Sequence, residues 1–225
     1  MHRYDSIENV KYDGSLIGEE VWAFNKLDGQ NFGAKYNVRK KEFSDFTSRK
    51  CNVDETNEQF GDAVRYFKSM YADVLRDIVR ENSGKGGIFK GAEEITFFFE
   101  WYGDKSFAGF HVKGDEMKLA LIDVFTKKKG YIEPKPFYEI FCGREDILVP
   151  ELIYKGKLTQ DFITSINEND WTAEGCRYPM VKEGVVIRRS TILKGQRMPK
   201  VKTKTRWWLD RLHERFTEEE CRELE

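Results

Sequence analysis

The alternation of apolar and polar positions predicts a chain in which short strands predominate. Apolar runs at residues 21–26 and 32–39 flank Leu27-Asp28-Gly29-Gln30, a sequence typical of a hairpin turn. The same pattern predicts further strands over residues 94–101, 118–125, 184–189 and 196–203. We therefore expect a fold with extensive β-sheet.

Helical periodicity is clearest over residues 57–82, where apolar side chains recur at steps of three and four residues up to Asn82-Ser83-Gly84. Its aromatic stripe is more typical of a core face than of a ligand site. Shorter helices are predicted at residues 136–142 and 159–167. The tail from residue 206 also has a helical pattern, with one apolar side formed by Trp208, Leu212, Phe216 and Cys221. The glycine-rich residues 83–91 lack the order of a phosphate-binding loop and are interpreted as a flexible linker.

Composition excludes several classes of protein. The 225 residues include four cysteines without a CxxC pair and three scattered histidines, which argues against zinc hydrolases and His-based acyl transfer. No apolar run is long enough to cross a membrane, and the first residues lack the apolar region of a secretory signal. We expect a protein of the reducing cytoplasm, or a virus-encoded one acting there, with no membrane partner.

The formal net charge of −1 conceals a strongly basic stretch. Residues 182–206 carry nine lysines and arginines against one acid, Glu183. A solvated charged strand is the simplest interpretation of such a run. A local anionic ligand is the alternative, and neighbouring residues favour it.

Lys26 ends an apolar run just before the turn containing Asp28 and Gly29. Partial shielding there favours the neutral, nucleophilic form of a lysine, which covalent catalysis requires. By itself Lys-x-Asp-Gly is a weak signal, since an ordinary hairpin has the same pattern.

Two carboxylates stand out. Glu100 lies among the aromatic residues of 97–102, where burying a carboxylate is expensive unless it has a partner; a solvent-facing strand position is the alternative. Glu183, an acid in a basic environment, is suited to hold a divalent metal against phosphates. A strand-start residue paired with a lysine is equally consistent with the position of Glu183.

Alternation along residues 199–204 places Lys200, Lys202 and Lys204 on one face of a strand. Three clustered ammonium groups repel one another unless an anion lies between them, and a triphosphate supplies that charge. A solvated edge strand that blocks aggregation remains the alternative.

The order of these segments resembles the covalent nucleotidyltransferase superfamily of RNA ligases, DNA ligases and mRNA capping enzymes. The resemblance covers residues 15–206 and rests on Lys26-Leu27-Asp28-Gly29, Ser48-Arg49-Lys50, Phe99-Glu100-Trp101-Tyr102-Gly103, Leu121-Ile122-Asp123-Val124-Phe125, Glu183-Gly184-Val185-Val186-Ile187-Arg188 and Lys200-Val201-Lys202. Asn31 and residues 149–158 are most similar to a stand-alone RNA ligase. About twenty residues follow the last lysine motif, too few for the OB-fold domain typical of DNA ligases and capping enzymes.

The resemblance implies an α/β (α+β) nucleotidyltransferase domain of the ATP-grasp-like type over residues 1–205. It has antiparallel sheets, flanking helices and a central nucleotide cleft, and a short helical tail follows at residues 206–225. It implies an ATP-dependent RNA ligase that joins 3′-hydroxyl and 5′-phosphate ends through lysyl-AMP and RNA-adenylate intermediates. ATP and Mg²⁺, or Mn²⁺ in its place, are the implied cofactors, and we expect a monomer.

The resemblance also implies a role for each residue. Lys26 is the expected nucleophile, in a turn shaped by Asp28 and Gly29, with Asn25 beside the nucleotide. Glu183 positions the metal, and Lys200 and Lys202 neutralise the phosphates. The expected phosphate, ribose and RNA contacts come from Asn31, Arg49, Glu100, Arg188, Arg189 and Lys204. The adenine platform is Ile122, where the family often has an aromatic residue, or alternatively Phe125.

Three other interpretations remain at this point: a DNA ligase, a GTP-dependent capping guanylyltransferase and a catalytically silent nucleic-acid-binding module. The short tail argues against the first two. The combination of Lys26 and Glu183 argues against the third, because a binding module needs no acid among its lysines.

Overall fold

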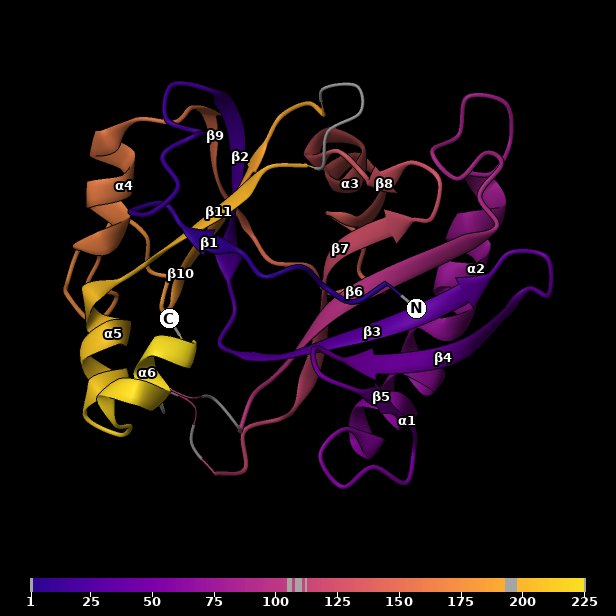
Figure 1. Ribbon diagram of the computed structural model, residues 1–225, viewed down its shortest axis with the longest axis horizontal. Coiled ribbons are helices and arrows are strands. Elements are labelled where there is room, and N and C mark those ends of the chain that lie inside the picture. Colours follow the sequence, from indigo (N-terminus) through magenta and orange to yellow (C-terminus); the bar gives the residue numbers. More distant parts are fainter. Residues whose placement is uncertain (1, 105–106, 108–110, 112, 193–197, 225) are drawn as a thin grey trace. The chain divides into compact units, whose positions relative to one another are not determined.

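The computed structural model describes residues 2–104, 107, 111, 113–192 and 198–224. The chain divides into two compact units, and each contains one β-sheet with helices (Figure 1). Unit 1 comprises Met1–Asp5, Gln30–Tyr102 and Glu116–Val149. Unit 2 comprises Ser6–Gly29, Gly103–Asp115 and Pro150–Glu225. Each unit is therefore assembled from segments that lie far apart in the sequence.

The sheet of unit 1 has the strand order β5-β4-β3-β6-β7-β8. The strands are β3 (Gly29–Asn37), β4 (Glu42–Ser48), β5 (Asn52–Val53), β6 (Glu94–Tyr102), β7 (Lys118–Thr126) and β8 (Gly130–Tyr131). The helices are α1 (Gly61–Met70), α2 (Ala72–Glu81) and α3 (Pro134–Phe141).

An aromatic core joins α1 and α2 to this sheet. The ring of Phe67 on α1 lies 6.0 Å from that of Phe32 and 5.6 Å from that of Phe99, and Tyr71 stacks on Phe99 at 5.4 Å. The single helix predicted over residues 57–82 is instead two helices that meet at Tyr71. The Tyr71 hydroxyl donates a buried hydrogen bond of 2.8 Å to the carbonyl oxygen of Leu119, which anchors this break to β7.

The sheet of unit 2 has the order β1-β11-β10-β2-β9. Its strands are β1 (Glu8–Asn9), β2 (Glu20–Lys26), β9 (Leu152–Lys157), β10 (Gly184–Arg189) and β11 (Lys200–Lys204). The helices are α4 (Gln160–Asn167), α5 (Arg206–His213) and α6 (Glu218–Leu224). Most pairs are antiparallel as predicted, but β1 runs parallel to β11. The part of the predicted strand 196–203 that precedes residue 198 lies outside the described residues.

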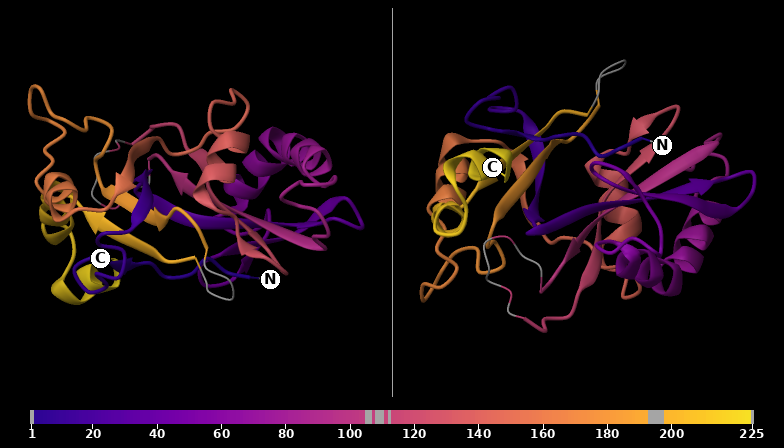
Figure 2. Two further views of the ribbon diagram at one scale, coloured as in Figure 1. Left: turned by 90° about the horizontal axis from the view of Figure 1, so that it is seen from above. Right: turned by 60° about the horizontal axis from the view of Figure 1, so that its bottom comes forward.

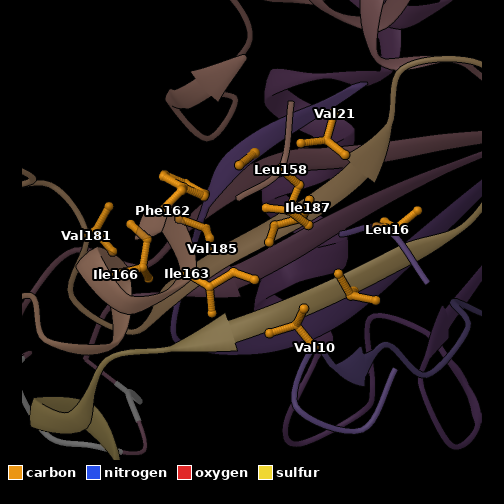
Figure 3. Packing of buried hydrophobic residues seen from close by; sticks show 12 residues of the cluster. Val10, Leu16, Val21, Leu158, Phe162, Ile163, Ile166, Val181, Val185 and Ile187 are labelled. Carbon is orange, nitrogen blue, oxygen red and sulfur yellow. The ribbon is translucent and has the colours of Figure 1, made fainter. Parts of the chain in front are cut away.

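One face of this sheet forms the core of unit 2 (Figure 3). Val21 on β2 and Val185 and Ile187 on β10 are fully buried, and they belong to one cluster with Phe162 and Ile166 of α4. A second, smaller cluster contains Trp208, Leu212 and Cys221, with Phe216 packed against it. The apolar side predicted for the C-terminal tail is therefore confirmed.

The hairpin predicted around Leu27-Asp28-Gly29-Gln30 is wrong. β2 pairs with β10 and β9, whereas β3 pairs with β4 and β6, so the two runs belong to different sheets (Figures 1 and 2). The turn therefore connects unit 2 to unit 1, because β2 and β3 each pair with strands that lie elsewhere in the sequence and not with each other. Among the described residues, no helix has the length and apolar character needed to span a membrane.

Candidate active site

Strand register places three residues of unit 2 in one row. Gly184, the first residue of β10, is level with Lys26 at the end of β2 and with Lys204 at the end of β11. Side chains of paired residues on neighbouring strands point to the same face of a sheet. The register therefore brings together two lysines that are 178 positions apart in the sequence.

Glu183 joins these two lysines. Its Oε1 atom lies 2.9 Å from Lys26 Nζ and 3.2 Å from Lys204 Nζ. The side chains of Glu183 and Lys204 are 3% and 1% exposed, whereas that of Lys26 is 23% exposed. Lys26 is thus the member of this triad, Lys26-Glu183-Lys204, that a ligand from solvent can reach.

Lys204 is held by an aromatic ring as well as by a carboxylate. Its Nζ lies 3.6 Å from the centroid of the Trp208 ring, within the range of a cation–π interaction. Burial lowers the pKa of Lys204 to about 8; the charges of Lys26 and Lys202 also lower it, and Glu183 acts in the opposite direction. Trp208 was not among the residues predicted for the site, although it contacts Lys204. Its position four residues after Lys204, at the start of a helix, was the available signal.

Two polar residues fix the end of β11. Thr205 is the N-cap of α5: its Oγ1 accepts from the Trp208 amide at 3.1 Å and donates to the Lys182 carbonyl oxygen at 2.6 Å. Asn167 donates from Nδ2 to the carbonyl oxygen of Lys204 at 2.8 Å. These bonds hold the backbone just before Glu183 and at Lys204 and Thr205, and so help to position Glu183 and Lys204 for their ion pair.

The backbone conformation and the close strand contact at residue 184 both require glycine. Its φ of 155° disfavours any residue with a side chain, and a Cβ there would lie 2.1 Å from the carbonyl oxygen of Thr203. Glycine therefore allows β10 and β11 to approach closely beside Glu183.

We expect Gly184→Ala to lower the free energy of unfolding by at least about 2 kcal/mol, because it combines backbone strain with a backbone clash. Urea denaturation measures this. Gly175→Ala is the matched control, since Gly175 also has a positive φ of 72° but has no atom within 4 Å of the added Cβ. Equal losses of stability in the two variants would contradict a close approach of β10 and β11 at Gly184.

The next rows contain the other lysines of β11. Lys202 is level with Val186 and Phe24, and Lys200 is level with Arg188 and Trp22. The register thus places Lys204, which was expected to contact RNA, nearer to Lys26 than Lys200 and Lys202, which were expected to neutralise the phosphates. At about 3.3 Å per residue, Lys200 lies roughly 13 Å along the strand from Lys204.

The two arginines of β10 have different surroundings. Arg188 is 2% exposed, with its guanidinium 5.2 Å from the Phe24 ring. Arg189 is paired with Glu19 through an N–O distance of 2.6 Å and is 21% exposed. Their roles in binding RNA stay predictions, but the burial of Arg188 does not favour a phosphate contact.

Asn25 and Asp28, which flank Lys26, are both buried. Asn25 Nδ2 donates to Glu151 Oε2 and to the carbonyl oxygen of Met180, each at 2.9 Å. These bonds tie the end of β2 to residues 151 and 180. Asn25 Oδ1 is buried and has no hydrogen-bond partner among the described residues, so an acceptor remains beside Lys26.

Three further predicted residues lie in unit 1. Asn31 on β3 is 9% exposed and donates from Nδ2 to the carbonyl oxygen of Phe99 at 3.3 Å. Its Oδ1 has no partner among the described residues. Glu100 on β6 is partly buried opposite Ala120, and Arg49 is exposed in the turn after β4.

Phe125 and Ile122, the two candidate adenine platforms, differ in how much of the side chain a base could contact. Phe125 is stacked by His2 of the same unit, with centroids 3.8 Å apart. Ile122 lies at a shift of register where β7 opposes β6, and it is partly exposed. Because His2 covers one face of Phe125, Ile122 is the better candidate of the two.

A metal fits this site through a single carboxylate. No group of three or more metal-ligating side chains occurs among the described residues. Glu183 Oε2, however, is buried and has no hydrogen-bond partner there, so an acceptor oxygen beside two lysines remains available. Mg²⁺ commonly binds one or two carboxylates together with substrate phosphates and water, and this donor set suits that arrangement.

Neither a protein family model nor a curated protein matches the sequence. Among solved structures, a Naegleria gruberi RNA ligase with pyrophosphate has a TM-score of 0.63 at 15% identity, covering 96% of this chain and 59% of that chain. A mutant of the same ligase with ATP and Mn has a TM-score of 0.62 at 15% identity, over 96% and 58%. Another mutant, with AMP and Mn, has a TM-score of 0.60 at 15% identity, over 93% and 57%.

The mixed α+β fold predicted from the resemblance is thereby confirmed as similar to that of an RNA ligase, a covalent nucleotidyltransferase. At 15% identity the likeness is one of fold. The chain spans about 59% of the length of that ligase, so the remainder of that protein has no counterpart in this match.

Proposed function

We propose that this chain is an ATP-dependent RNA ligase that works through a covalent lysyl-AMP. The observation that carries the proposal is the triad, in which a buried carboxylate bridges the partly exposed Lys26 and the buried Lys204. The fold supports the same conclusion, since the similar structures are those of an RNA ligase.

In the first step, Lys26 Nζ attacks the α-phosphorus of ATP. A nitrogen–phosphorus bond forms, the bond to the bridging oxygen breaks and pyrophosphate leaves. The ammonium group must first lose a proton, and the Glu183 carboxylate is an acceptor at 2.9 Å. Lys204 supplies positive charge next to Glu183, where the charge of the phosphates develops in the transition state.

Two further transfers complete the reaction. An oxygen of the RNA 5′-phosphate attacks the phosphorus of lysyl-AMP, which frees Lys26 and gives an adenylylated RNA end. A 3′-hydroxyl then attacks the 5′-phosphate, forms the phosphodiester bond and releases AMP. In this proposal Asn31, Arg49 and Glu100 contact the phosphates and ribose, and Ile122 supports the adenine.

Glu183 would hold a divalent ion through Oε2, the oxygen that has no partner among the described residues. Held there, such an ion would supply Lewis-acid stabilisation of the charge on the phosphate oxygens. The similar ligase structures contain Mn with ATP or AMP, which supports a divalent cation here.

The substrate is tested by joining. We expect the protein with ATP and Mg²⁺ to join RNA that carries a 5′-phosphate and a 3′-hydroxyl, both as free strands and as a nicked duplex. The same assays with DNA strands, and with GTP in place of ATP, are the controls. Joining of DNA but not of RNA, or label transfer from GTP alone, would reject an RNA ligase in favour of a related nucleotidyltransferase.

The strand register predicts which lysines serve the first step. We expect Lys204→Met to lower the rate of lysyl-AMP formation by about a hundredfold or more, because it removes the charge held against Glu183. Lys200→Met, further along the same strand, should lower this rate by less than about tenfold. Single-turnover adenylylation measures both.

Sealing of RNA that is already adenylylated separates the steps, because it bypasses the attack on ATP. Lys204→Met should retain more of this activity than of adenylylation. A parental rate of adenylylation in Lys204→Met would remove Lys204 from the reaction and return it to the role predicted from the sequence, a contact with RNA.

A further inference from the structure

Three loops of unit 1 meet at one end of its sheet. They are residues 38–41 between β3 and β4, residues 83–92 between α2 and β6, and residues 127–129 between β7 and β8; Figure 1 shows the elements that they join. The amide of Val38 donates to the carbonyl oxygen of Glu93 at 3.0 Å, and that of Lys127 donates to Glu94 at 3.3 Å. Lys129 Nζ donates to the carbonyl oxygen of Ile88 at 3.0 Å. We call these three loops the basic end.

The middle loop is part of this structure and is not the flexible linker that its glycines suggested. It connects two elements of the same unit, and its Phe89 is 1% exposed. The Phe89 amide donates to the carbonyl oxygen of Asn82 at 3.0 Å. A buried side chain and backbone bonds therefore fix this loop beside the other two.

The basic end carries more positive charge than its acids neutralise. Its exposed cations are Arg39, Lys40, Lys41, Lys85, Lys90, Lys127, Lys128 and Lys129. Adjacent carboxylates pair with three of them: Glu42 with Lys40 at 3.6 Å, Glu94 with Lys127 at 3.4 Å and Glu93 with Lys128 at 2.7 Å. Among the described residues no carboxylate forms an ion pair with the other five, which are Arg39, Lys41, Lys85, Lys90 and Lys129.

The backbone of Lys41 adds a second observation. Its φ is 57°, and no other described residue except glycine has a positive φ. Glycine or asparagine adopts this conformation at less cost, so a lysine here carries strain of about 1 kcal/mol. Lys41 is therefore the third consecutive cation of this turn, after Arg39 and Lys40, although glycine or asparagine would suit its backbone conformation better.

We propose that the basic end is a docking surface for the phosphate backbone of RNA. The choice of partner rests on the proposed function, whose substrate is a polynucleotide. The large apolar side chains that the structure exposes lie outside these loops, and Ile88 within them is only partly exposed. The surface therefore offers no exposed ring for stacking on bases and no exposed large apolar side chain for insertion into a lipid surface. Cations alone contact phosphates without reading sequence, and the contact should therefore be independent of RNA sequence and weakened by salt.

The test measures binding of a fluorescent single-stranded RNA by anisotropy over a range of KCl concentrations. Arg39→Gln with Lys129→Gln removes two of these five cations, from two different loops. Arg80→Gln with Lys135→Gln is the matched control, because it removes the same charge from side chains of unit 1 that are 72% and 68% exposed and lie in ion pairs on helices.

We expect the first double variant to bind RNA about tenfold more weakly than the parent at 0.1 M KCl. The slope of log affinity against log salt should become shallower by about 1.4, which is roughly 0.7 for each phosphate that the variant no longer neutralises. The control should keep the parental slope. Equal slopes and affinities in the two double variants would overturn the proposal, as would weaker binding of the first variant to phosphatidylserine vesicles with RNA binding intact.

Lys41→Asn separates binding from folding. Asparagine suits the positive φ, so this variant should be at least as stable as the parent in urea and yet bind RNA more weakly. Parental RNA affinity in Lys41→Asn would overturn the proposal that the basic end binds RNA.

Adenylylation by ATP, which uses no RNA, should be unchanged in every variant of the basic end. A parent protein that binds RNA in this way but forms no adduct with ATP would contradict the proposed function and leave the docking surface intact.

Discussion

We expect replacement of Lys26 with alanine to abolish the transfer of label from α-labelled ATP to the protein. Lys26 is partly exposed at the end of β2 and lies 2.9 Å from a carboxylate that can take its proton. Covalent catalysis requires a neutral amine aimed at the α-phosphorus, and alanine has no group that forms the bond. Denaturing electrophoresis after incubation with the labelled nucleotide measures the loss, and we expect no label above background.

Lys157→Ala is the control for this result. Lys157 is an exposed lysine on β9, the strand that pairs with β2 on the other side from β10. Its removal changes the net charge equally and should leave labelling at the parental level. The sealing of pre-adenylylated RNA should also survive in Lys26→Ala, because that step no longer needs the nucleophile. Persistent labelling of Lys26→Ala would assign the covalent bond to another residue.

Glu183→Gln is the second variant with a large expected effect. Glutamine keeps the volume of Glu183 but removes the charge that bridges the two lysines and the proposed contact with a divalent ion. We expect adenylylation to fall by at least about a hundredfold, the scale on which a preorganised electrostatic group acts. The Mg²⁺ concentration that gives the highest rate should increase. An unchanged dependence on Mg²⁺ would exclude the proposed metal contact of Glu183, and a parental rate as well would leave Glu183 with a structural role only.

Stability distinguishes these two roles further. Glu183→Gln leaves the ammonium group of Lys204, 1% exposed, without its carboxylate, which should cost about 3 kcal/mol of unfolding free energy. Adding Lys204→Met to Glu183→Gln removes that uncompensated charge and should restore much of the stability while adenylylation stays low. A double variant as unstable as Glu183→Gln would mean that the loss has a cause other than the buried charge.

The sequence predicted the strands of the candidate site well because their apolar runs are short and sharply bounded. The strand predicted at residues 184–189 coincides with β10, and Lys26 ends β2 as expected. Strands such as β4 and β9 were not predicted. Their sequences, EFSDFTS and LIYKGK, mix polar residues into partly exposed positions, so the apolar pattern that marks a buried strand is weak there.

The pairing of the strands could not be predicted from the local sequence pattern. Alternation correctly put Lys200, Lys202 and Lys204 on one face of a strand, but which of them lies nearest to Lys26 depends on the register of β10 with both neighbours. Register is determined by long-range packing and not by the strand itself. The same limit explains the incorrect hairpin, since a turn sequence does not reveal that the strands on either side join different sheets.

The burial of individual charged residues also could not be predicted from the sequence. Lys204 looks like any lysine of a basic strand, yet its surroundings come from Glu183 and from Trp208 of the following helix. Conversely, His2 covers Phe125 although 123 positions separate them, which makes one candidate adenine platform less available than its sequence context implied.

Mass spectrometry of the intact protein after incubation with ATP and Mg²⁺ tests the central claim most directly. The proposal predicts a species heavier by one AMP moiety that is lost in acid, survives alkali and reverts to the free protein when pyrophosphate is added. Fragmentation of the peptide that contains residue 26 should place the adduct on Lys26. No adduct with any nucleoside triphosphate, or an adduct on a residue other than Lys26, would contradict the account.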